Sequence, residues 1–188
     1  MSPFQDLLAR EFAPYGELTP EQLASLEGHH KLLTQWNARL NLTRIRSLLD
    51  SVQLHYCESL FLGRALPAGS LKIADIGSGA GFPGIPIGIL RPECSVTLVE
   101  SHQRKAVFLQ EAVRGLKNIK VASSRAEDLR EQYDWLVSRA VASKDILALS
   151  LSPSRALLVG EGEFSDAQPM PWGNGRFLAF VPRGTSNR

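Results

Sequence analysis

The residues most able to do chemistry lie in a glycine-rich segment, residues 73–86, which reads Ile-Ala-Asp-Ile-Gly-Ser-Gly-Ala-Gly-Phe-Pro-Gly-Ile-Pro. It begins in a short apolar run of the kind that a parallel sheet buries on both faces. The glycines of this segment are Gly77, Gly79, Gly81 and Gly84. Glycine allows a tight turn and lets a ligand approach bare backbone. A buried strand followed by such a turn predicts a binding site for a nucleotide-type cofactor.

Two cofactors compete for this loop. The pattern Gly-x-Gly-x-x-Gly at residues 79–84 matches the dinucleotide fingerprint, and Glu100 follows at about the distance that suits a ribose hydroxyl. A pyrophosphate, however, would be repelled by Asp75, and Pro83 and Pro86 lack the N–H groups that cradle phosphate at a helix start. S-adenosylmethionine has no phosphate, carries an ammonium and a sulfonium, and needs an acid for its ribose diol. Asp75 and Glu100 therefore favour this methyl donor over NAD.

From residue 71 onward, strands are expected to alternate with helices, which predicts an open, mostly parallel α/β sheet of Rossmann-like type. The expected strands are 71–76, 95–100, 119–122, 135–138, 156–159 and 177–181. The expected helical segments are a short helix after the glycine turn that ends at about residue 90, a helix over 102–115 and a short turn at 127–132. Ligands of such sheets bind beyond the carboxyl ends of the strands. The polar residues that fall at these ends are Asp75, Glu100, residues 124–127, Ser138 and Arg139.

The front of the chain predicts a helical cap over residues 1–66, followed by an α/β core over 67–188, the two forming one compact unit. Thr19, Pro20 and Gln22 make a capping box with a first-turn proline. The apolar stripe that follows is expected to face the core, and consists of Leu23, Leu26, His30, Leu33, Trp36 and Leu40. A second helix is expected over residues 48–64.

Composition is that of an ordinary globular protein of 188 residues, with 44% apolar and 21% charged residues. No apolar run is long enough to predict a membrane span, and the N-terminus has no signal-peptide pattern. Cys57 and Cys94 have no metal-ligand spacing and are interpreted as reduced thiols. These features predict a cytoplasmic protein without a metal site.

The net charge is only +2, but basic residues gather in two segments. Residues 31–46 hold four of them and no acid, and residues 102–120 hold five against Glu111. Such segments either form a local positive surface that follows phosphates or are simply solvated helix faces. The sequence leaves both interpretations open.

Four strings of the sequence belong together: Asn41-Leu-Thr43 after Trp36-Asn37, the segment 75–86, Arg91-Pro92, and Ser138-Arg-Ala-Val-Ala-Ser143. With these strings the chain resembles one known family, the bacterial glucose-inhibited division protein B family. The resemblance covers about residues 20–160 and resumes at Gly175–Phe180. Members of that family are guanine-N7 methyltransferases of 16S ribosomal RNA. The resemblance therefore implies S-adenosylmethionine as cofactor, no metal, and the RNA or an assembling small subunit as partner of a monomeric enzyme.

The resemblance also implies particular site residues. Gly77 and Phe82 would meet the donor in the glycine loop, Ala126 and Glu127 would lie beside its adenine, and Arg139 would close the site from the end of the fourth strand. With the residues already singled out, the expected donor site comprises Asp75, Gly77, Gly79, Gly81, Phe82, Glu100, Ala126, Glu127 and Arg139. Asn41, His55 and Arg139 are implied near the acceptor. Asn41 is equally well interpreted as a helix cap, and Arg139 as a surface ion-pair partner.

This chain departs from the family's pattern in two places. The family commonly has His-x-x-x-Asp-Ser, whereas His55 is followed here by Glu58 and Ser59. The family usually has a lysine in an Ala-Leu-Lys-Gly turn after the fifth strand, but residues 157–163 hold no lysine and two acids. The second difference bears on acceptor binding and leaves the donor site unaffected.

Guanine N7 carries a free lone pair, so its methylation needs orientation and electrostatics and no general base. No catalytic acid or base is therefore expected, and the strings used on exocyclic amines or pyrimidine C5 are missing. Two other functions stay open: a methyltransferase on another acceptor, and a non-catalytic RNA- or ribosome-binding module. A NAD-dependent oxidoreductase ranks below these because no Tyr-x-x-x-Lys pair is present.

Overall fold

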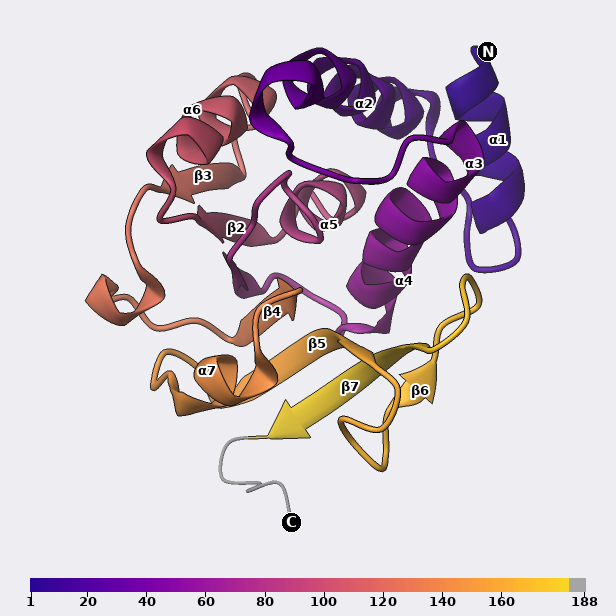
Figure 1. Cartoon of the computed structure of the whole chain (residues 1–188). Coiled ribbons are helices and arrows are strands. Elements are labelled where there is room, and N and C mark those ends of the chain that lie inside the picture. Colours follow the sequence, from indigo (N-terminus) through magenta and orange to yellow (C-terminus); the bar gives the residue numbers. More distant parts are fainter. Residues whose placement is uncertain (183–188) are drawn as a thin grey trace.

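A computed structural model describes residues 1–182, and within that range a seven-stranded sheet has the order β3-β2-β1-β4-β5-β7-β6 (Figure 1). The strands are β1 Lys72–Ile76, β2 Ser95–Val99, β3 Ile119–Ala122, β4 Trp135–Arg139, β5 Ser154–Gly160, β6 Gln168–Pro169 and β7 Arg176–Pro182. Strands β3, β2, β1, β4 and β5 are parallel, and β7 runs antiparallel to both β5 and β6. The predicted mostly parallel α/β sheet is confirmed, and the segment before the last strand, whose conformation the sequence leaves open, forms β6 and pairs with β7.

The order of the sheet reverses direction beside β1, which pairs with β2 on one side and with β4 on the other. Ile76 at the end of β1 lies level with Val99 of β2 and with Ser138 of β4. The loops that follow these three strands therefore leave the sheet at the same edge. In open α/β sheets a reversal of this kind opens a crevice at the carboxyl ends of the strands, where ligands bind.

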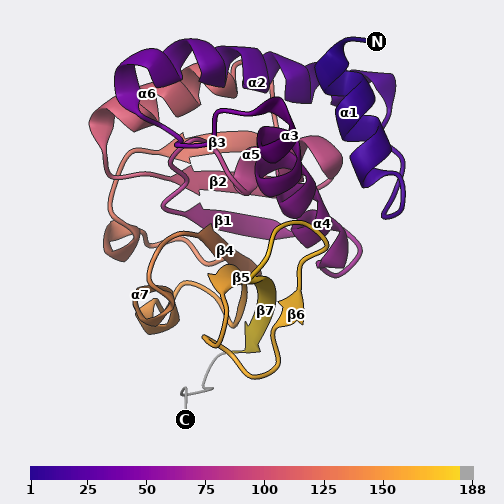
Figure 2. The ribbon, with the colours of Figure 1, turned by 45° about the vertical axis from the view of Figure 1, so that its right-hand side comes forward.

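Helices cover the two faces of the sheet unequally. They are α1 Pro3–Phe12, α2 Pro20–Leu40, α3 Leu48–Ser51, the π-helical turn η1 Val52–Cys57, α4 Glu58–Ala65, α5 Gly84–Leu90, α6 Gln103–Ala112, the 3-10 turn η2 Ala126–Asp128 and α7 Ser143–Ala148. Figure 2 shows α2 lying across α5 and α6 on one side, with α7 apart from them beside β4 and β5. Successive strand residues point to opposite faces, so Ile73 joins the core under the larger helical layer and Ala74 joins the smaller one with Ile146 of α7.

The helical cap begins as the sequence predicts but differs in detail. Thr19 and Gln22 form the expected capping box at the start of α2. On the apolar stripe His29 is enclosed, at 3% exposed, in place of the expected His30, which instead stacks on Phe4. Both positions fit helical spacing between Leu26 and Leu33, so periodicity could not choose between them.

The second expected helix, 48–64, is interrupted by the π-helical turn η1. A π turn inserts one extra residue and is frequently found at functional sites. Side chains of α1, α2 and α4 share one buried cluster with the sheet. The division at residue 66 stays a prediction, and residues 183–188 lie outside the described part of the chain. Among the described helices, none is both long and apolar enough to cross a membrane.

Candidate functional site at the carboxyl edge of the sheet

The glycine loop after β1 is held against the neighbouring strands by backbone hydrogen bonds. The N–H groups of Gly77 and Ser78 donate to the carbonyl of Val99, at 2.9 and 3.1 Å. Gly77 has a φ of +71°, and a Cβ there would lie 2.4 Å from Cγ2 of Val141. Glycine is thus required at residue 77 both by its backbone conformation and by the close approach of the segment that follows β4.

Asp75 lies beneath this loop and is fully buried. Its Oδ2 accepts a hydrogen bond from the N–H of Gly84 at 3.0 Å, while Oδ1 has no hydrogen-bond partner among the described residues. Burial raises the pKa of Asp75 to about 7. The carboxyl group therefore supports the loop from below, and its expected contact with a ligand ammonium stays a prediction.

Glu100 lies beside the loop at the end of β2, as the sequence predicts. Its Oε2 accepts from the N–H of Gly79 at 3.0 Å, and its Oε1 accepts from the N–H of His102 at 2.7 Å. The side chain is 7% exposed. Glu100 thus joins the glycine loop to the start of α6, with lone pairs left over for a hydroxyl.

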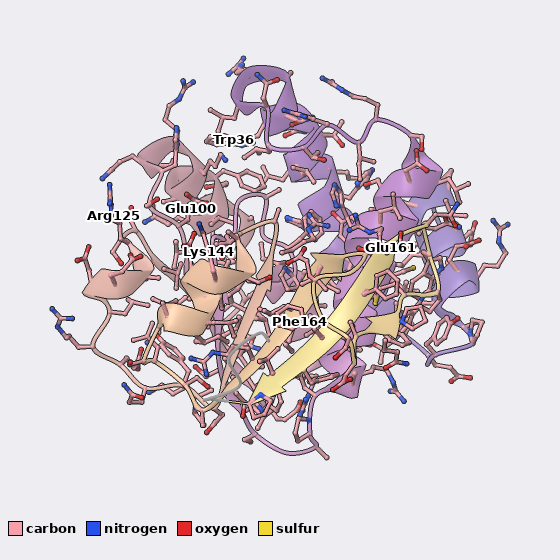
Figure 3. The ribbon with its side chains drawn as sticks, turned by 60° about the horizontal axis from the view of Figure 1, so that its bottom comes forward. Trp36, Glu100, Arg125, Lys144, Glu161 and Phe164 are labelled. Atoms are coloured by element: carbon pink, nitrogen blue, oxygen red, sulfur yellow. The ribbon has the colours of Figure 1, made fainter. Side chains whose placement is uncertain are left out.

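A cavity of about 270 Å³ opens at this edge of the sheet. Its lining residues are Ile76, Gly77, Val99, Ser101, Ser124, Arg125, Ala126, Glu127 and Val141. The structure therefore brings together Gly77, from the loop after β1, and Ala126 and Glu127, from the segment after β3. Figure 3 shows Glu100 and Arg125 on the same side of the molecule. The other predicted donor-site residues do not line this cavity, which we call the donor cavity; they are Asp75, Gly79, Gly81, Phe82, Glu100 and Arg139.

Phe82 points away from the donor cavity and supports a second constellation. Its ring is stacked on His55, with centroids 4.5 Å apart and planes 15° apart, and the guanidinium of Arg139 lies 5.0 Å from its centroid. Nη1 of Arg139 donates to Nδ1 of His55 at 2.7 Å and to the carbonyl of Leu54 at 2.9 Å. An aromatic face is a favourable surface for a cation. Phe82 therefore packs against both His55 and Arg139.

Because a guanidinium can only donate, Nδ1 of His55 is the acceptor and Nε2 carries the proton. That proton is directed at Oγ1 of Thr43, 2.8 Å away. Burial, reinforced by the charge of Arg139, lowers the pKa of His55 to about 2. Burial also lowers the pKa of Arg139, to about 10, so Arg139 stays cationic at neutral pH.

A larger cavity of about 530 Å³ lies on the other side of Val141, which lines both. Its charged and polar wall comprises Arg44, His55, Glu58, Arg139, Glu163 and Arg176. We call it the acceptor cavity. Ala140, between Arg139 and the shared Val141, has a φ of +65°, which is a strained conformation for a residue other than glycine. The two cavities adjoin at this strained segment.

Comparison with known proteins identifies the family of this chain. A family model described as GidB, rRNA small subunit methyltransferase G, matches residues 22–164. The chain belongs to the rRNA small subunit methyltransferase G family. Curated members include proteins of Desulforamulus reducens, 40% identical over 70% of this chain and 59% of that one, and Moorella thermoacetica, 38% identical over 86% and 70%. A member from Xanthomonas axonopodis pv. citri is 43% identical over 71% of this chain and 66% of its own. This chain thus spans about three-fifths of the Desulforamulus relative.

Solved structures agree on the fold. TrmK of M. capricolum, in complex with S-adenosyl-homocysteine, has a TM-score of 0.54 and 10% identity, covering 68% of each chain. Coclaurine N-methyltransferase has a TM-score of 0.50 and 16% identity, covering 82% of this chain and 56% of that one. At such low identity these likenesses show a shared methyltransferase fold and nothing about the substrate.

Asn41, which the family resemblance implied near the acceptor, lines neither cavity and has an exposed side chain. It ends α2 in the left-handed conformation, with a φ of +48°, as its interpretation as a helix cap predicts. Asn37, and not Asn41, forms hydrogen bonds with the segment that follows α2. Its amide donates to the carbonyl of Thr43 and accepts from the N–H of Thr43, at 3.0 and 2.8 Å. In the sequence, only the string Trp36-Asn37 pointed to Asn37.

Two acidic residues that depart from the family's usual pattern, Glu58 and Glu163, line the acceptor cavity. The carboxylate of Glu58, fully buried, forms a bidentate ion pair with Arg176 on β7. Glu163 stands in the stretch where the family usually has a lysine. Its carboxylate accepts from the N–H of Gly160 at 3.0 Å and from Oγ of Ser143 at 2.7 Å. The acidic loop is therefore tied across the mouth of the cavity to the start of α7.

Proposed function

We propose that this chain is an S-adenosylmethionine-dependent methyltransferase that acts on N7 of a guanine in 16S ribosomal RNA. The observation that carries the proposal is the pair of cavities that adjoin at Val141, on the carboxyl edge of a methyltransferase sheet. Gly77 of the glycine loop lines the donor cavity, and Arg44 and Arg139 are among the residues that line the acceptor cavity. Family membership supplies the reaction and the RNA.

The residues around the donor cavity fit S-adenosylmethionine. Glu100 is positioned to accept from the ribose diol, and Ala126 and Glu127 form the wall for the adenine. Oδ1 of Asp75 is a buried acceptor without a partner among residues 1–182, which suits a nearby ammonium once the loop adjusts. When bound, this cofactor supplies a methyl group on a sulfonium that is a good leaving group. The chain's task is to hold it in line with the acceptor and to exclude water.

Residues of the acceptor cavity orient a base without accepting its proton. The nitrogens of His55 are engaged by Arg139 and Thr43, and its low pKa keeps it neutral. This agrees with a reaction at a nitrogen that already has a free lone pair. Arg44 and Arg139 line the cavity without an ion-pair partner among residues 1–182, whereas Arg176 is paired with Glu58, so these two arginines suit an electron-rich base or its phosphate. We place the substrate contact of His55 and Arg139 here, and leave Asn41 outside it.

The proposal extends to the setting of the enzyme. We propose that it works as a monomer in the cytoplasm, on the RNA itself or on an assembling small subunit. Support for the RNA comes from basic side chains on α6 and on the segment after α2 that form no ion pair within residues 1–182, including Arg44, Arg46 and Lys105.

A second candidate is a methyltransferase on a different acceptor, or a module that binds RNA without methylating it. It is favoured by one observation, the acidic Glu161 and Glu163 at a position where the family usually has a lysine. A carboxylate at the mouth of the acceptor cavity repels phosphate and would change which substrate enters.

The decisive experiment incubates the protein with methyl-labelled S-adenosylmethionine and small ribosomal subunits from cells that lack such an enzyme, and then maps the labelled base. Label at N7 of one guanine is expected. The variant Arg139→Gln should lose the label while still binding S-adenosylhomocysteine by calorimetry. Arg10→Gln, a charge-matched control on α1, should behave as the wild type. Donor binding without any labelled base would reject the acceptor assignment.

A further inference from the structure

A third cavity, larger than the donor and acceptor cavities, lies away from both. It is a groove of about 630 Å³ between the last turns of α2 and the first turns of α6. Its walls include Trp36, Arg39 and Leu40 from α2 and Arg104 and Val107 from α6. Figure 3 shows Trp36 above Glu100, on the side of the molecule that also carries Arg125. The proposed function leaves this groove unused.

The floor of the groove is aromatic and apolar. Trp36 is only partly buried, and its ring packs against Phe108 with centroids 5.8 Å apart and planes 60° apart. Val107 beside it is 51% exposed and adds apolar surface to the groove. Phe108 fixes the indole, so the ring needs no ordering when a ligand stacks on it.

The rim of the groove is cationic. Arg39 and Arg104 are both exposed, and neither makes an ion pair or a hydrogen bond within residues 1–182. Among those same residues, no acid lines the groove. Two free guanidinium groups beside a tryptophan face suit a ligand with both a phosphate and a planar ring, because arginine binds phosphate strongly and bases stack on aromatic rings.

The groove is joined to the acceptor cavity by a very short piece of chain. Leu40 lines the groove and Arg44 lines the acceptor cavity. The four residue steps from Leu40 to Arg44 span at most about 14 Å. The two sites are therefore separated by only a few nucleotides of an extended RNA strand. The loop 41–46 carries two further arginines without an acid among them.

We infer that this groove binds one nucleotide of single-stranded RNA, with the base on Trp36 and the flanking phosphates on Arg39 and Arg104. The inference rests on the proposed function, because it makes the groove a docking site for the RNA strand that enters the acceptor cavity. It adds a contact outside the target base, and it gives the basic residues of α2 and α6 a defined task.

The test uses hexauridylate, a single-stranded RNA with no guanine to enter the acceptor cavity. Quenching of tryptophan fluorescence reports stacking on Trp36, because Trp172 is 6% exposed against Tyr15 and Trp135 packs on Phe180. We expect saturable quenching that the Trp36→Phe variant loses. Fluorescence anisotropy of dye-labelled hexauridylate measures the affinity of variants that lack this tryptophan. Trp36→Leu keeps the apolar contact with Phe108 and should weaken binding roughly 5- to 150-fold, the range for lost base stacking.

The double variant Arg39→Gln/Arg104→Gln tests the phosphate contacts. It should lower the slope of log affinity against log salt by about 1.4, since each contact to a single strand contributes about 0.7. Arg10→Gln/Arg64→Gln is the charge-matched control, on α1 and α4. An equal loss in that control, or an unchanged slope in the groove variant, would overturn the inference. So would tighter binding of poly-glutamate than of hexauridylate, since an acidic peptide would then be the occupant.

Calorimetry with S-adenosylhomocysteine separates this inference from the proposed function. A protein that binds the nucleoside normally but shows no quenching with hexauridylate would overturn the groove alone. A protein that fails to bind the nucleoside would overturn the donor site, and the groove would still be decided by the quenching and by its salt dependence.

Discussion

Nδ1 of His55 accepts a hydrogen bond of 2.7 Å from the guanidinium of Arg139, although 84 residues separate the two in the chain. His55 comes from the π-helical turn before α4, and Arg139 from the last residue of β4. Both lie against the ring of Phe82, which belongs to the glycine loop. Three segments of the chain therefore fix one cation at the wall of the acceptor cavity.

The variant His55→Leu should slow methyl transfer roughly 10- to 100-fold, because a displaced positioning group costs rate even when binding persists. We expect kcat to fall more than KM rises, with S-adenosylhomocysteine affinity unchanged. His55→Asn, whose side-chain oxygen can replace Nδ1, should recover part of the rate. His30→Leu, which alters a residue stacked on Phe4 outside both cavities, is the control. Equal rates for His55→Leu and wild type would remove the positioning role.

The contribution of His29 and His55 to stability should fall as the pH is lowered below about 6.5, the ordinary pKa of histidine. Burial lowers the pKa of His55 to about 2 and that of His29 to about 4, so the unfolded chain binds protons that the folded chain does not. Each histidine should cost about 2 kcal/mol between pH 7 and pH 5. Urea denaturation at both values measures this cost. In His55→Asn the loss should be smaller by about 2 kcal/mol, whereas the exposed His102→Asn should leave it unchanged.

Asp75→Asn should affect stability and binding in opposite directions. Burial raises the pKa of Asp75 to about 7, so its contribution to stability is present at low pH and is lost as pH rises through 7. At pH 8 the neutral amide should stabilise the fold by about 2 to 4 kcal/mol. Affinity for S-adenosylhomocysteine should fall, since the charge that would attract its ammonium is removed. Asp145→Asn, an exposed control on α7, should change neither. Unchanged affinity in Asp75→Asn would leave Asp75 with a purely structural role.

Gly77→Ala should weaken nucleoside binding at least about tenfold, because its Cβ would push Val141 out of the wall shared by both cavities. The double variant Gly77→Ala/Val141→Ala removes the colliding methyl groups and should recover part of the affinity. Gly115→Ala has a similar φ, +92°, with nothing within 4 Å of the added Cβ, and so controls for backbone strain alone. If the double variant binds no better than Gly77→Ala, strain and not the collision is responsible.

Glu163→Lys should raise the affinity for ribosomal RNA and steepen its salt dependence by about 0.7, the value of one added phosphate contact. The physical reason is that the carboxylate now held by Ser143 and Gly160 lies in the acceptor cavity. Filter binding over a range of salt concentrations measures both quantities. Glu161→Lys, on the same loop and outside the lining of that cavity, is the matched control. Equal gains in the two variants would indicate a general effect of net charge.

The features that could be predicted from the sequence are those set by neighbours along the chain. The glycine turn after a buried strand, the capping box of Thr19 and Gln22, and the period of the strands each depend on residues a few positions apart. The carboxyl ends of parallel strands meet by geometry, so the approach of Gly77 to Glu127, and of Glu100 to the glycine loop, could also be expected.

Only the tertiary structure decided which side chains are buried and which partners they contact. His29 is enclosed where His30 was expected, Asp75 lies under the loop, and Phe82 faces His55 and not the donor cavity. The ion pair of Glu58 with Arg176 joins residues 118 positions apart, and nothing local marks either partner. Such contacts depend on how a π-helical turn, a reversed sheet order and an antiparallel last strand bring distant backbone together. Local sequence fixes the elements, whereas the packing between them fixes the protonation states and partners on which the site depends.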